Sequence, residues 1–215
     1  MLLELVLPRR CAVCGAPRSD ICGSCVAGLV RIEPPLCARC GAPTAWPVAR
    51  CAECSGRRLA FATARAAVEH EPALVRAWKE LGLRRVAAVA ADLVVERLSR
   101  PDGVLVPVPP DPERLLRRGA DTSGALAREL ARRWRLPLAA PLARAHGRRQ
   151  RGLSRAERRR NVAGAFVSRP APERIVLVDD VYTSGATAHA AAFALRRAGA
   201  REVHVVTFAR AIRRA

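Results

Sequence analysis

Residues 175–187 read IVLVDDVYTSGAT: an apolar run ends in two carboxylates, Asp179 and Asp180, and a hydroxyl-rich turn with one glycine follows. Such a short apolar run is typical of a buried strand. The turn opens residues 186–198, which have the composition of a helix and end before a glycine. A second apolar run covers 202–208, and a strand, helix and strand in this order pair in parallel. The sequence therefore predicts an α/β domain with a parallel sheet.

The preceding chain extends the α/β pattern. Residues 62–69 predict a strand, and 72–98 predict a helix because apolar residues recur at helical spacing. Residues 104–108 predict a buried strand that a proline-rich turn ends, and a further helix is expected at 122–134. Together these elements predict a parallel sheet flanked by helices.

The turn after the acidic pair is suited to a phosphate. Backbone N–H groups at a helix start converge on an anion, and the helix dipole favours negative charge there. Hydroxyl side chains add donors, and no Gly-Lys-Ser/Thr of a nucleotide P-loop follows the glycine. The predicted phosphate-binding residues are Thr183, Ser184, Gly185, Ala186 and Thr187.

The two carboxylates suit a sugar better than a phosphate. Ionised Asp179 and Asp180 would repel phosphate, whereas they can accept hydrogen bonds from two ribose hydroxyls. In a simpler interpretation the aspartates only end a strand and a hydroxyl residue caps a helix, which is common in α/β proteins. Strand, acidic pair, turn and helix occur here in register, and this favours a ribose 5-phosphate site.

All eight cysteines lie between residues 11 and 54, in four CxxC pairs. Each pair presents two thiolates from one tight turn, and two turns complete a tetrahedral zinc site. Four copies disfavour redox chemistry, and a reducing cytoplasm disfavours disulfides. Closed four-thiolate sites have a structural role. The predicted ligands of two structural zinc ions are Cys11, Cys14, Cys22 and Cys25 for one and Cys37, Cys40, Cys51 and Cys54 for the other, with a crossed pairing left open.

These patterns divide the chain into a zinc-ribbon module at 1–58 and an α/β domain at 59–215. The opening stretch 1–8 lacks the basic region of an export signal and carries Glu4. The later apolar runs are shorter than the roughly 18 residues that span a bilayer. We therefore expect a cytoplasmic protein without membrane insertion.

The chain is strongly basic, with a net charge of +19 that arises almost wholly from arginine, since Lys79 is the only lysine. Such a field attracts polyanions, but an arginine excess also fits a solvated surface. The arginine-rich tract 144–160 has two interpretations, a loop that closes over pyrophosphate or a surface for a DNA or RNA backbone. The arginines proposed for the loop are Arg148, Arg149, Arg151 and Arg155.

Residues 175–187 resemble the phosphoribosyl pyrophosphate signature of the type I phosphoribosyltransferases. Tyr182 stands where a small aliphatic residue is usual, and Ser184 replaces a threonine. The whole chain resembles the ComF family (ComFC/GntX-like proteins), in which a cysteine-rich ribbon region precedes a phosphoribosyltransferase domain. Four further segments carry this resemblance, namely WKELG at 78–82, VPVP at 106–109, LRRG at 116–119 and QRGLSRAERRRNVAGAF at 150–166.

The resemblance implies a type I phosphoribosyltransferase fold that binds phosphoribosyl pyrophosphate with Mg²⁺. In such an enzyme a nitrogen nucleophile displaces pyrophosphate from the anomeric carbon of the ribose. Asp179 and Asp180 would then be the catalytic pair that holds the ribose hydroxyls. Pro107 and Val108 would form the pyrophosphate loop, and Arg118, with its neighbour Arg117, would add a cationic donor.

One segment departs from the family pattern. After Arg118-Gly119 the family usually continues Phe-Asn-Gln, whereas this chain has Ala120-Asp121-Thr122. The change falls beside the expected pyrophosphate or acceptor pocket. It bears on catalytic competence and acceptor choice more than on phosphate binding.

Three functions are consistent with these features. The favoured one is a phosphoribosyltransferase linked to DNA uptake or nucleotide salvage. The second is a competence accessory that binds single-stranded DNA and partners other competence proteins, because the ComF resemblance implies a link to natural transformation and zinc ribbons with a basic surface suit DNA. The third is a non-catalytic sensor of phosphoribosyl pyrophosphate, which the altered segment after Gly119 would favour.

Overall fold

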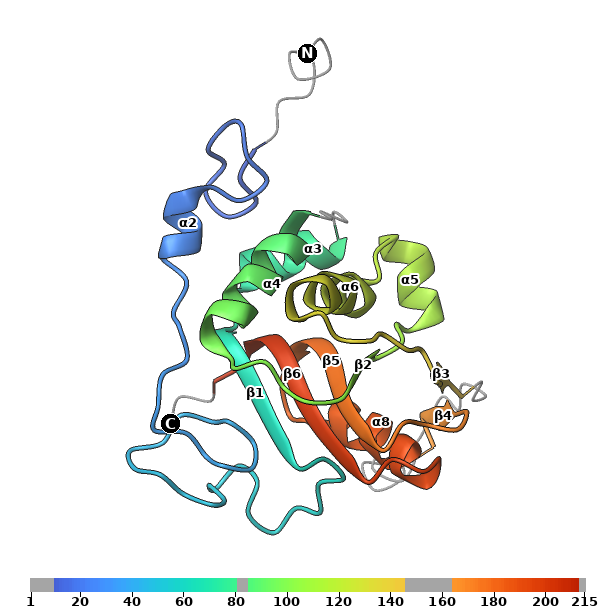
Figure 1. Cartoon of the computed structure of the whole chain (residues 1–215). Coiled ribbons are helices and arrows are strands. Elements are labelled where there is room, and N and C mark those ends of the chain that lie inside the picture. The colour runs from blue at the N-terminus through green and yellow to red at the C-terminus, as the bar shows by residue number, and fades with distance from the viewer. Residues whose placement is uncertain (1–9, 81–84, 146–163, 213–215) are drawn as a thin grey trace, which may run out of the picture.

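A four-stranded parallel sheet forms the centre of the computed structural model, which describes residues 10–80, 85–145 and 164–212 (Figure 1). The spatial order of its strands is β1-β6-β5-β2. Their bounds are Thr63–Glu69 for β1, Val104–Pro107 for β2, Arg174–Tyr182 for β5 and Glu202–Arg210 for β6. The predicted fold class, a parallel sheet flanked by helices, is confirmed.

Helices and a hairpin cover the two faces of the sheet (Figure 1). On one face lie α3 (Pro72–Glu80), α4 (Arg85–Arg97) and α6 (Thr122–Trp134). On the other lie α8 (Ala186–Arg197) and the antiparallel pair β3 (Leu142–Arg144) and β4 (Phe166–Ser168). The short helix α5 (Pro112–Arg118) connects β2 to α6.

The long helix predicted at 72–98 is instead two helices, α3 and α4. Their apolar faces both join the core under β1 and β6, where Trp78 packs edge-on to Phe208 at 5.9 Å between ring centroids. The helical spacing of apolar residues thus identified the buried faces of both helices, but it did not show that the segment contains two helices. Residues 81–84 lie outside the described part of the chain.

The two halves of the cysteine-rich module pack on opposite faces of the sheet. In the first half, the partly buried Val13, Ile21 and Val26 pack against the core of the helical face that contains α4 and α6. The second half buries three of its cysteines in the core under α8, which also contains Phe61 and Tyr182. The module boundary at residue 58 stays a prediction, but one core cluster contains residues from both sides of it.

The segment between the two halves runs beside the edge strand β1. Ile32 N donates to the carbonyl of Ala67 at 3.0 Å, and Glu69 N donates to that of Val30 at 2.8 Å. These bonds use backbone groups of β1 that would otherwise face water at the sheet edge. The cysteine-rich module therefore contacts the sheet through backbone hydrogen bonds to β1 as well as through the two core clusters.

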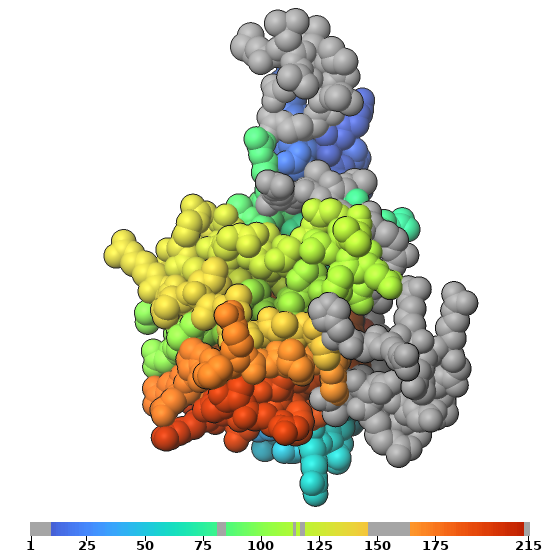
Figure 2. Space-filling model, turned by 90° about the vertical axis from the view of Figure 1, so that its right-hand side faces the viewer, coloured from blue at the N-terminus to red at the C-terminus, as the bar shows by residue number. Residues whose placement is uncertain are grey.

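On the face seen in Figure 2, the green and yellow surface of α5 and α6 lies above the orange and red surface that runs from β4 to β6. The first half of the module, in blue, stands at the top. Within the described residues, every helix falls short of the length and apolar character that a membrane crossing needs. The cytoplasmic location stays a prediction.

Candidate functional site

The acidic pair lies where the carboxyl ends of β2 and β5 meet. Pro107 of β2 is in register with Val178 of β5, and Val108 N donates to the carbonyl of Val178 at 2.9 Å. The peptide after β2 is thereby held beside Asp179 and Asp180. A pocket of about 310 Å³ opens here. Open α/β sheets bind ligands outside the carboxyl ends of their strands, so this is the expected place for a site.

Two hydroxyls from the first turn of α6 hold the acidic pair. Thr122 Oγ1 donates to Asp180 Oδ2 at 2.5 Å, and Ser123 Oγ donates to Asp179 Oδ1 at 2.8 Å. The Nζ atom of Lys79 lies 3.1 Å from Asp180 Oδ1. The positive end of the α6 dipole faces the same carboxylates. Asp180 is only 6% exposed, so these partners offset the cost of burying its charge.

Burial and the neighbouring charge of Asp180 raise the pKa of Asp179 to about 7, against the hydrogen bond from Ser123. The native carboxyl therefore keeps its proton at pH values where the unfolded chain has released it. This contribution to stability is present below the unfolded pKa of 3.8 and is lost as the pH rises through about 7.

We expect Asp179→Asn to stabilise the ligand-free protein at pH 8 by about 1–2 kcal/mol, or roughly 2–8 °C in Tm. The amide oxygen can still accept from Ser123 and carries no charge to bury. Thermal melts at pH 5 and pH 8 measure the effect, with Asp102→Asn on an exposed bend as the control. An equal Tm difference at the two pH values would contradict the assigned cause.

The turn between β5 and α8 has a left-handed glycine at its centre. Gly185 has φ 72° and ψ 8° and precedes the first residue of α8. A Cβ atom there would collide with the hydroxyl of Tyr182, so the position needs glycine for both reasons. The first N–H groups of a helix have no acceptor within it, and the first turn of α8 has no acidic residue. The turn can therefore receive an anion.

The structure brings together several of the predicted site residues. Asp179, Asp180, Thr183, Thr187 and Val108 line the pocket. The turn also contains Ser184, Gly185 and Ala186, while Pro107 ends β2 and Arg118 ends α5. The side chains of Arg117 and Arg118 lie outside the described part of the structure, as do Arg148, Arg149, Arg151 and Arg155. The ligand roles of all these residues stay predictions.

Several pocket residues were not among the predicted site residues, and Lys79, Ser123 and Arg144 are three of them. Lys79 and Ser123 contact the acidic pair, and Arg144 lines the pocket and donates from Nε to the carbonyl of Pro109 at 3.1 Å. Lys79 had a signal in the sequence, because it is the only lysine among 38 basic residues. Arg144 was noted only as the first residue of the arginine-rich tract 144–160, and Ser123 had no signal, since its position depends on how α6 packs.

The departure at residues 120–122 has a definite structure. Asp121 is the N-cap of α6, and its Oδ1 accepts from Gly124 N at 2.9 Å. Thr122 donates to Asp180, as described above, and Ala120 lines the pocket. The segment thus starts the helix that holds the acidic pair, and it leaves the pocket wall at Ala120 small.

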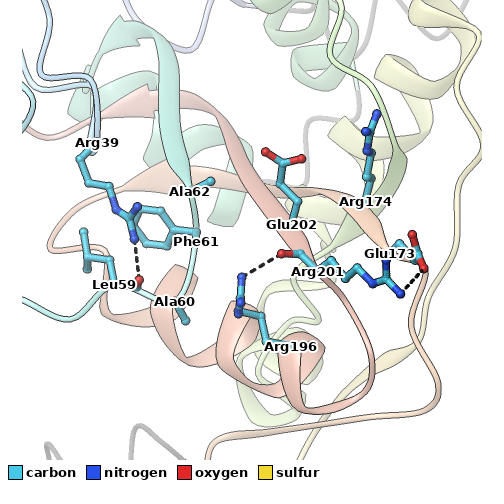
Figure 3. Close-up of a pocket in the computed structure, with 10 residues that line it drawn as sticks. All are labelled: Arg39, Leu59, Ala60, Phe61, Ala62, Glu173, Arg174, Arg196, Arg201 and Glu202. Atoms are coloured by element: carbon cyan, nitrogen blue, oxygen red, sulfur yellow. Dashed lines mark hydrogen bonds and ion pairs between the residues drawn. The ribbon is translucent and has the colours of Figure 1, made fainter.

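A larger pocket of about 690 Å³ lies at the amino ends of β1, β5 and β6, away from the acidic pair (Figure 3). Three of its four arginines are engaged with protein groups. Arg39 donates to the carbonyl of Leu59 at 2.7 Å and Arg196 to that of Arg201 at 3.0 Å. Arg201 pairs with Glu173 at 3.3 Å. None of the predicted ligand residues lines this pocket, so size alone does not mark the functional site.

The cysteines form two four-membered groups in sequential order, Cys11, Cys14, Cys22 and Cys25 in one and Cys37, Cys40, Cys51 and Cys54 in the other. The Sγ atoms within a group lie within 4.8 Å of one another. Three pairs are 3.5–3.6 Å apart, close to the roughly 3.8 Å between sulfurs of a tetrahedral zinc site. The donor sets therefore fit two structural zinc ions, and the sequential pairing is the observed one.

Backbone N–H groups favour the thiolate form of one cysteine in each zinc group. Burial opposes ionisation of Cys37, but the N–H groups of Arg39 and Cys40 in its own knuckle and of Cys51 in the facing one, at 3.3 Å, outweigh it and lower the pKa to about 6. The pKa of Cys11 is lowered to about 6 in the same way, and Cys22 N donates to its Sγ atom at 3.4 Å. Zinc binds thiolates, so both knuckles favour the form that it needs.

Comparison with known families matches both parts of the chain. Residues 2–55 match the family model "Double zinc ribbon domain", and residues 115–215 match "Phosphoribosyl transferase domain". The chain thus contains a double zinc ribbon region followed by a phosphoribosyl transferase domain. This confirms the predicted resemblance. Competence protein F of Haemophilus influenzae is 34% identical over 122 residues, which cover 54% of this chain and 53% of that protein. The chain thus spans about half the length of this curated relative.

Two solved structures align with part of this double zinc ribbon phosphoribosyltransferase-type chain. The glutamine phosphoribosylpyrophosphate amidotransferase from B. subtilis, complexed with ADP and GMP, is 24% identical with a TM-score of 0.41 and covers 56% of this chain and 25% of its own. TT1426 from Thermus thermophilus is 22% identical with a TM-score of 0.32, covering 60% and 73% respectively.

Proposed function

We propose that the pocket beside Asp179 and Asp180 binds phosphoribosyl pyrophosphate with Mg²⁺, and that the chain is a phosphoribosyltransferase. One observation carries this proposal. The buried acidic pair and the left-handed Gly185 turn follow each other at the carboxyl end of β5, and residues of both line one pocket. The proposed sugar-hydroxyl site and the proposed phosphate site thus adjoin the same pocket.

Each part of the ligand has a matching group. The 5-phosphate would accept from the N–H groups of 184–187 and from the Thr183 and Thr187 hydroxyls at the pocket wall. The ribose hydroxyls would donate to the acidic pair. Asp179 Oδ1 already accepts from Ser123 and from Asp180 N, so among the described contacts Oδ2 is the oxygen left for a hydroxyl.

The donor set also fits magnesium. Carboxylate oxygens are the protein ligands that Mg²⁺ prefers, usually together with phosphate oxygens of the substrate. Asp179 and Asp180 would hold the ion together with the ligand. When bound, Mg²⁺ neutralises the charge that develops on departing pyrophosphate.

In the proposed reaction a nitrogen nucleophile of the acceptor forms a bond to the anomeric carbon, and the bond from that carbon to pyrophosphate oxygen breaks with its electron pair. The chain's own residues position the ribose and receive the anion. Lys79 and the peptide at Val108 also line the pocket, where they would suit pyrophosphate. No covalent protein intermediate is needed.

The biological setting is proposed from the relative's name. Competence protein F supports a role for this chain in competence, linked to DNA uptake or nucleotide salvage. A cytoplasmic location agrees with two zinc–thiolate sites, because thiols stay reduced there. Single-stranded DNA is a second proposed ligand, favoured by the net charge of +19.

We expect calorimetry to detect saturable binding of phosphoribosyl pyrophosphate with Mg²⁺ to the zinc-loaded chain, and the double variant Asp179→Asn/Asp180→Asn to weaken it at least about 30-fold. Each lost charged acceptor removes a charge-assisted hydrogen bond worth about 1.5–3 kcal/mol. Excess ribose 5-phosphate should compete, because it carries the sugar and the 5-phosphate.

The matched control is Glu173→Gln, which removes one exposed carboxylate at the opposite end of the sheet and should bind as the native chain does. An acceptor screen that follows pyrophosphate release would then test turnover. Folded, zinc-loaded protein that binds nothing at millimolar ligand would overturn the proposal.

A further inference from the structure

Arg210, the last residue of β6, carries a buried guanidinium that reaches into the second zinc group. The residue is 1% exposed. Its NH1 donates to the carbonyl of Cys40 at 2.7 Å, and its NH2 donates to Glu53 Oε2 at 2.6 Å. The same NH2 lies 3.8 Å from Cys40 Sγ. The two knuckles of the second zinc group thus supply the acceptors of these three contacts.

A buried arginine needs negative charge nearby. A zinc ion with four thiolates carries a net charge of −2, and Glu53 adds a further negative charge beside Arg210. Loss of the ion would release the two knuckles that hold the Cys40 carbonyl and Glu53, the acceptors of Arg210. The position of Arg210 therefore depends on the metal as well as on the knuckle backbone.

The other face of the guanidinium packs on Tyr182. Its central carbon lies 4.5 Å from the ring centroid, within the range of a cation–π contact. Phe61 closes the other side of the ring edge-on, at 6.3 Å between centroids. Tyr182 is 5% exposed, so its ring is held between Arg210 and the apolar core.

Tyr182 in turn supports the proposed phosphate-binding turn. Its hydroxyl occupies the space where a Cβ of Gly185 would lie, so ring and turn are in direct contact. The backbone of Tyr182 is held too, because its carbonyl accepts from Ala211 N at 2.9 Å. The contacts run without a break from Cys40 through Arg210 and Tyr182 to Gly185.

The knuckle has little freedom to move independently. Gly41 has φ 70°, and a Cβ there would collide with the carbonyl of Ala64 in β1. Ala64 N also donates to the carbonyl of Arg39 at 3.0 Å. A change of the knuckle would therefore reach the sheet and Arg210 together.

We propose that Arg210 and Tyr182 are positioning residues that couple the second zinc site to the phosphate-binding turn. The inference rests on the proposed function, since it assigns phosphate to the 183–187 turn. Coupling between two binding sites is reciprocal. Phosphoribosyl pyrophosphate should slow zinc release from the second group, and zinc in that group should tighten ligand binding.

Zinc release from the full chain to a chromogenic chelator, with and without saturating phosphoribosyl pyrophosphate and Mg²⁺, tests the coupling. Cys14→Ser, which weakens the first group, identifies the kinetic phase that belongs to each group. We expect the ligand to slow the second phase about 3- to 10-fold and to leave the first phase unchanged. Equal slowing of both phases, or of neither in a chain that binds the ligand, would overturn the inference.

Matched variants locate the coupling. Tyr182→Phe removes the hydroxyl but keeps the ring under Arg210 and its edge carbon, 2.7 Å from the position of a Gly185 Cβ, so the protection should persist. Tyr182→Leu removes the aromatic ring of the stacked pair, and Arg210→Lys removes its guanidinium. In each variant the ligand should slow zinc release from the second group less than about 2-fold, while the zinc content stays at two per chain. Protection that survives in both variants contradicts the assigned path.

A ligand-free measurement separates this inference from the proposed function. Hydrogen exchange of the zinc-loaded Tyr182→Leu and Arg210→Lys variants should be at least about 5-fold faster at 183–187, with amides of β2 unchanged. This result supports the coupling even if phosphoribosyl pyrophosphate does not bind. Unchanged exchange at the turn, or an equal increase in β2, would overturn it.

Discussion

Gly185→Ala is expected to weaken binding of phosphoribosyl pyrophosphate at least about 100-fold. Gly185 has φ 72°, a left-handed conformation that costs an L-residue about 1–2 kcal/mol. The added methyl would also collide with the Tyr182 hydroxyl, so the turn or the ring must move. Either movement redirects the N–H groups that are proposed to receive the 5-phosphate. If the collision costs as much as the backbone conformation, the two costs sum to about 2–4 kcal/mol, and about 2.7 kcal/mol corresponds to 100-fold.

Calorimetry with phosphoribosyl pyrophosphate measures the loss, and Gly15→Ala is the matched control. Gly15 has a similar φ of 77°, but a Cβ there meets no atom within 4 Å. It lies in the first ribbon, which packs on the other face of the sheet. The control therefore carries the backbone cost without the collision, and its ligand affinity should stay within about 2-fold of native.

Near-native affinity of a folded Gly185→Ala chain would mean that the 5-phosphate does not use this turn. Loss of affinity for phosphoribosyl pyrophosphate with retained competition by ribose 5-phosphate would place the sugar phosphate elsewhere as well. We expect the affinity for both ligands to fall together, because both carry the 5-phosphate.

The elements that sequence reasoning predicted well have local causes. The bounds of α6, Thr122–Trp134, are those expected, because Asp121 caps the helix and apolar residues keep a helical period. The sequential zinc grouping follows from the short loops between knuckles. The 175–187 stretch places strand, acids and turn in covalent order, so the core of the candidate site could also be anticipated.

The features that the sequence did not predict depend on contacts between residues far apart along the chain. β5 was expected to end at Val178 but continues to Tyr182, since its backbone still pairs with β6 although Asp179 and Asp180 break the apolar pattern. Strands β3 and β4 have only three residues each. They pair with each other although they are far apart in the sequence, so neither has a clear local pattern. Lys79 meets Asp180 across 101 residues, a contact that only the fold creates.

The difference between the two zinc groups is another property that spacing does not reveal. All four CxxC pairs look alike in sequence, yet Cys37, Cys40 and Cys54 are at most 2% exposed within a core shared with β5 and α8. Cys14 is exposed, and the first group meets its core only through partly buried side chains. The same ligand chemistry therefore stabilises different amounts of structure.

Cys37→Ser is accordingly expected to destabilise the whole described fold, by at least about 4 kcal/mol, or roughly 8–16 °C in Tm. Structural zinc contributes about 10–16 kcal/mol of binding free energy in small zinc domains, and loss of one thiolate forfeits much of it. Here the loss also opens the core under α8, because Cys37 itself belongs to it. Near-ultraviolet circular dichroism should report the sheet domain unfolding in the same transition.

Cys14→Ser is the matched control, with the same change of one sulfur to oxygen in a CxxC pair. It should release one zinc per chain and lower the Tm of the sheet domain by less than about 4 °C, since only partly buried side chains such as Val13 and Ile21 lose their cover. Equal losses of Tm in the two variants would contradict this assignment. A larger loss in Cys37→Ser means that the second ribbon folds as part of the phosphoribosyltransferase core, and that the physical unit of folding crosses residue 58.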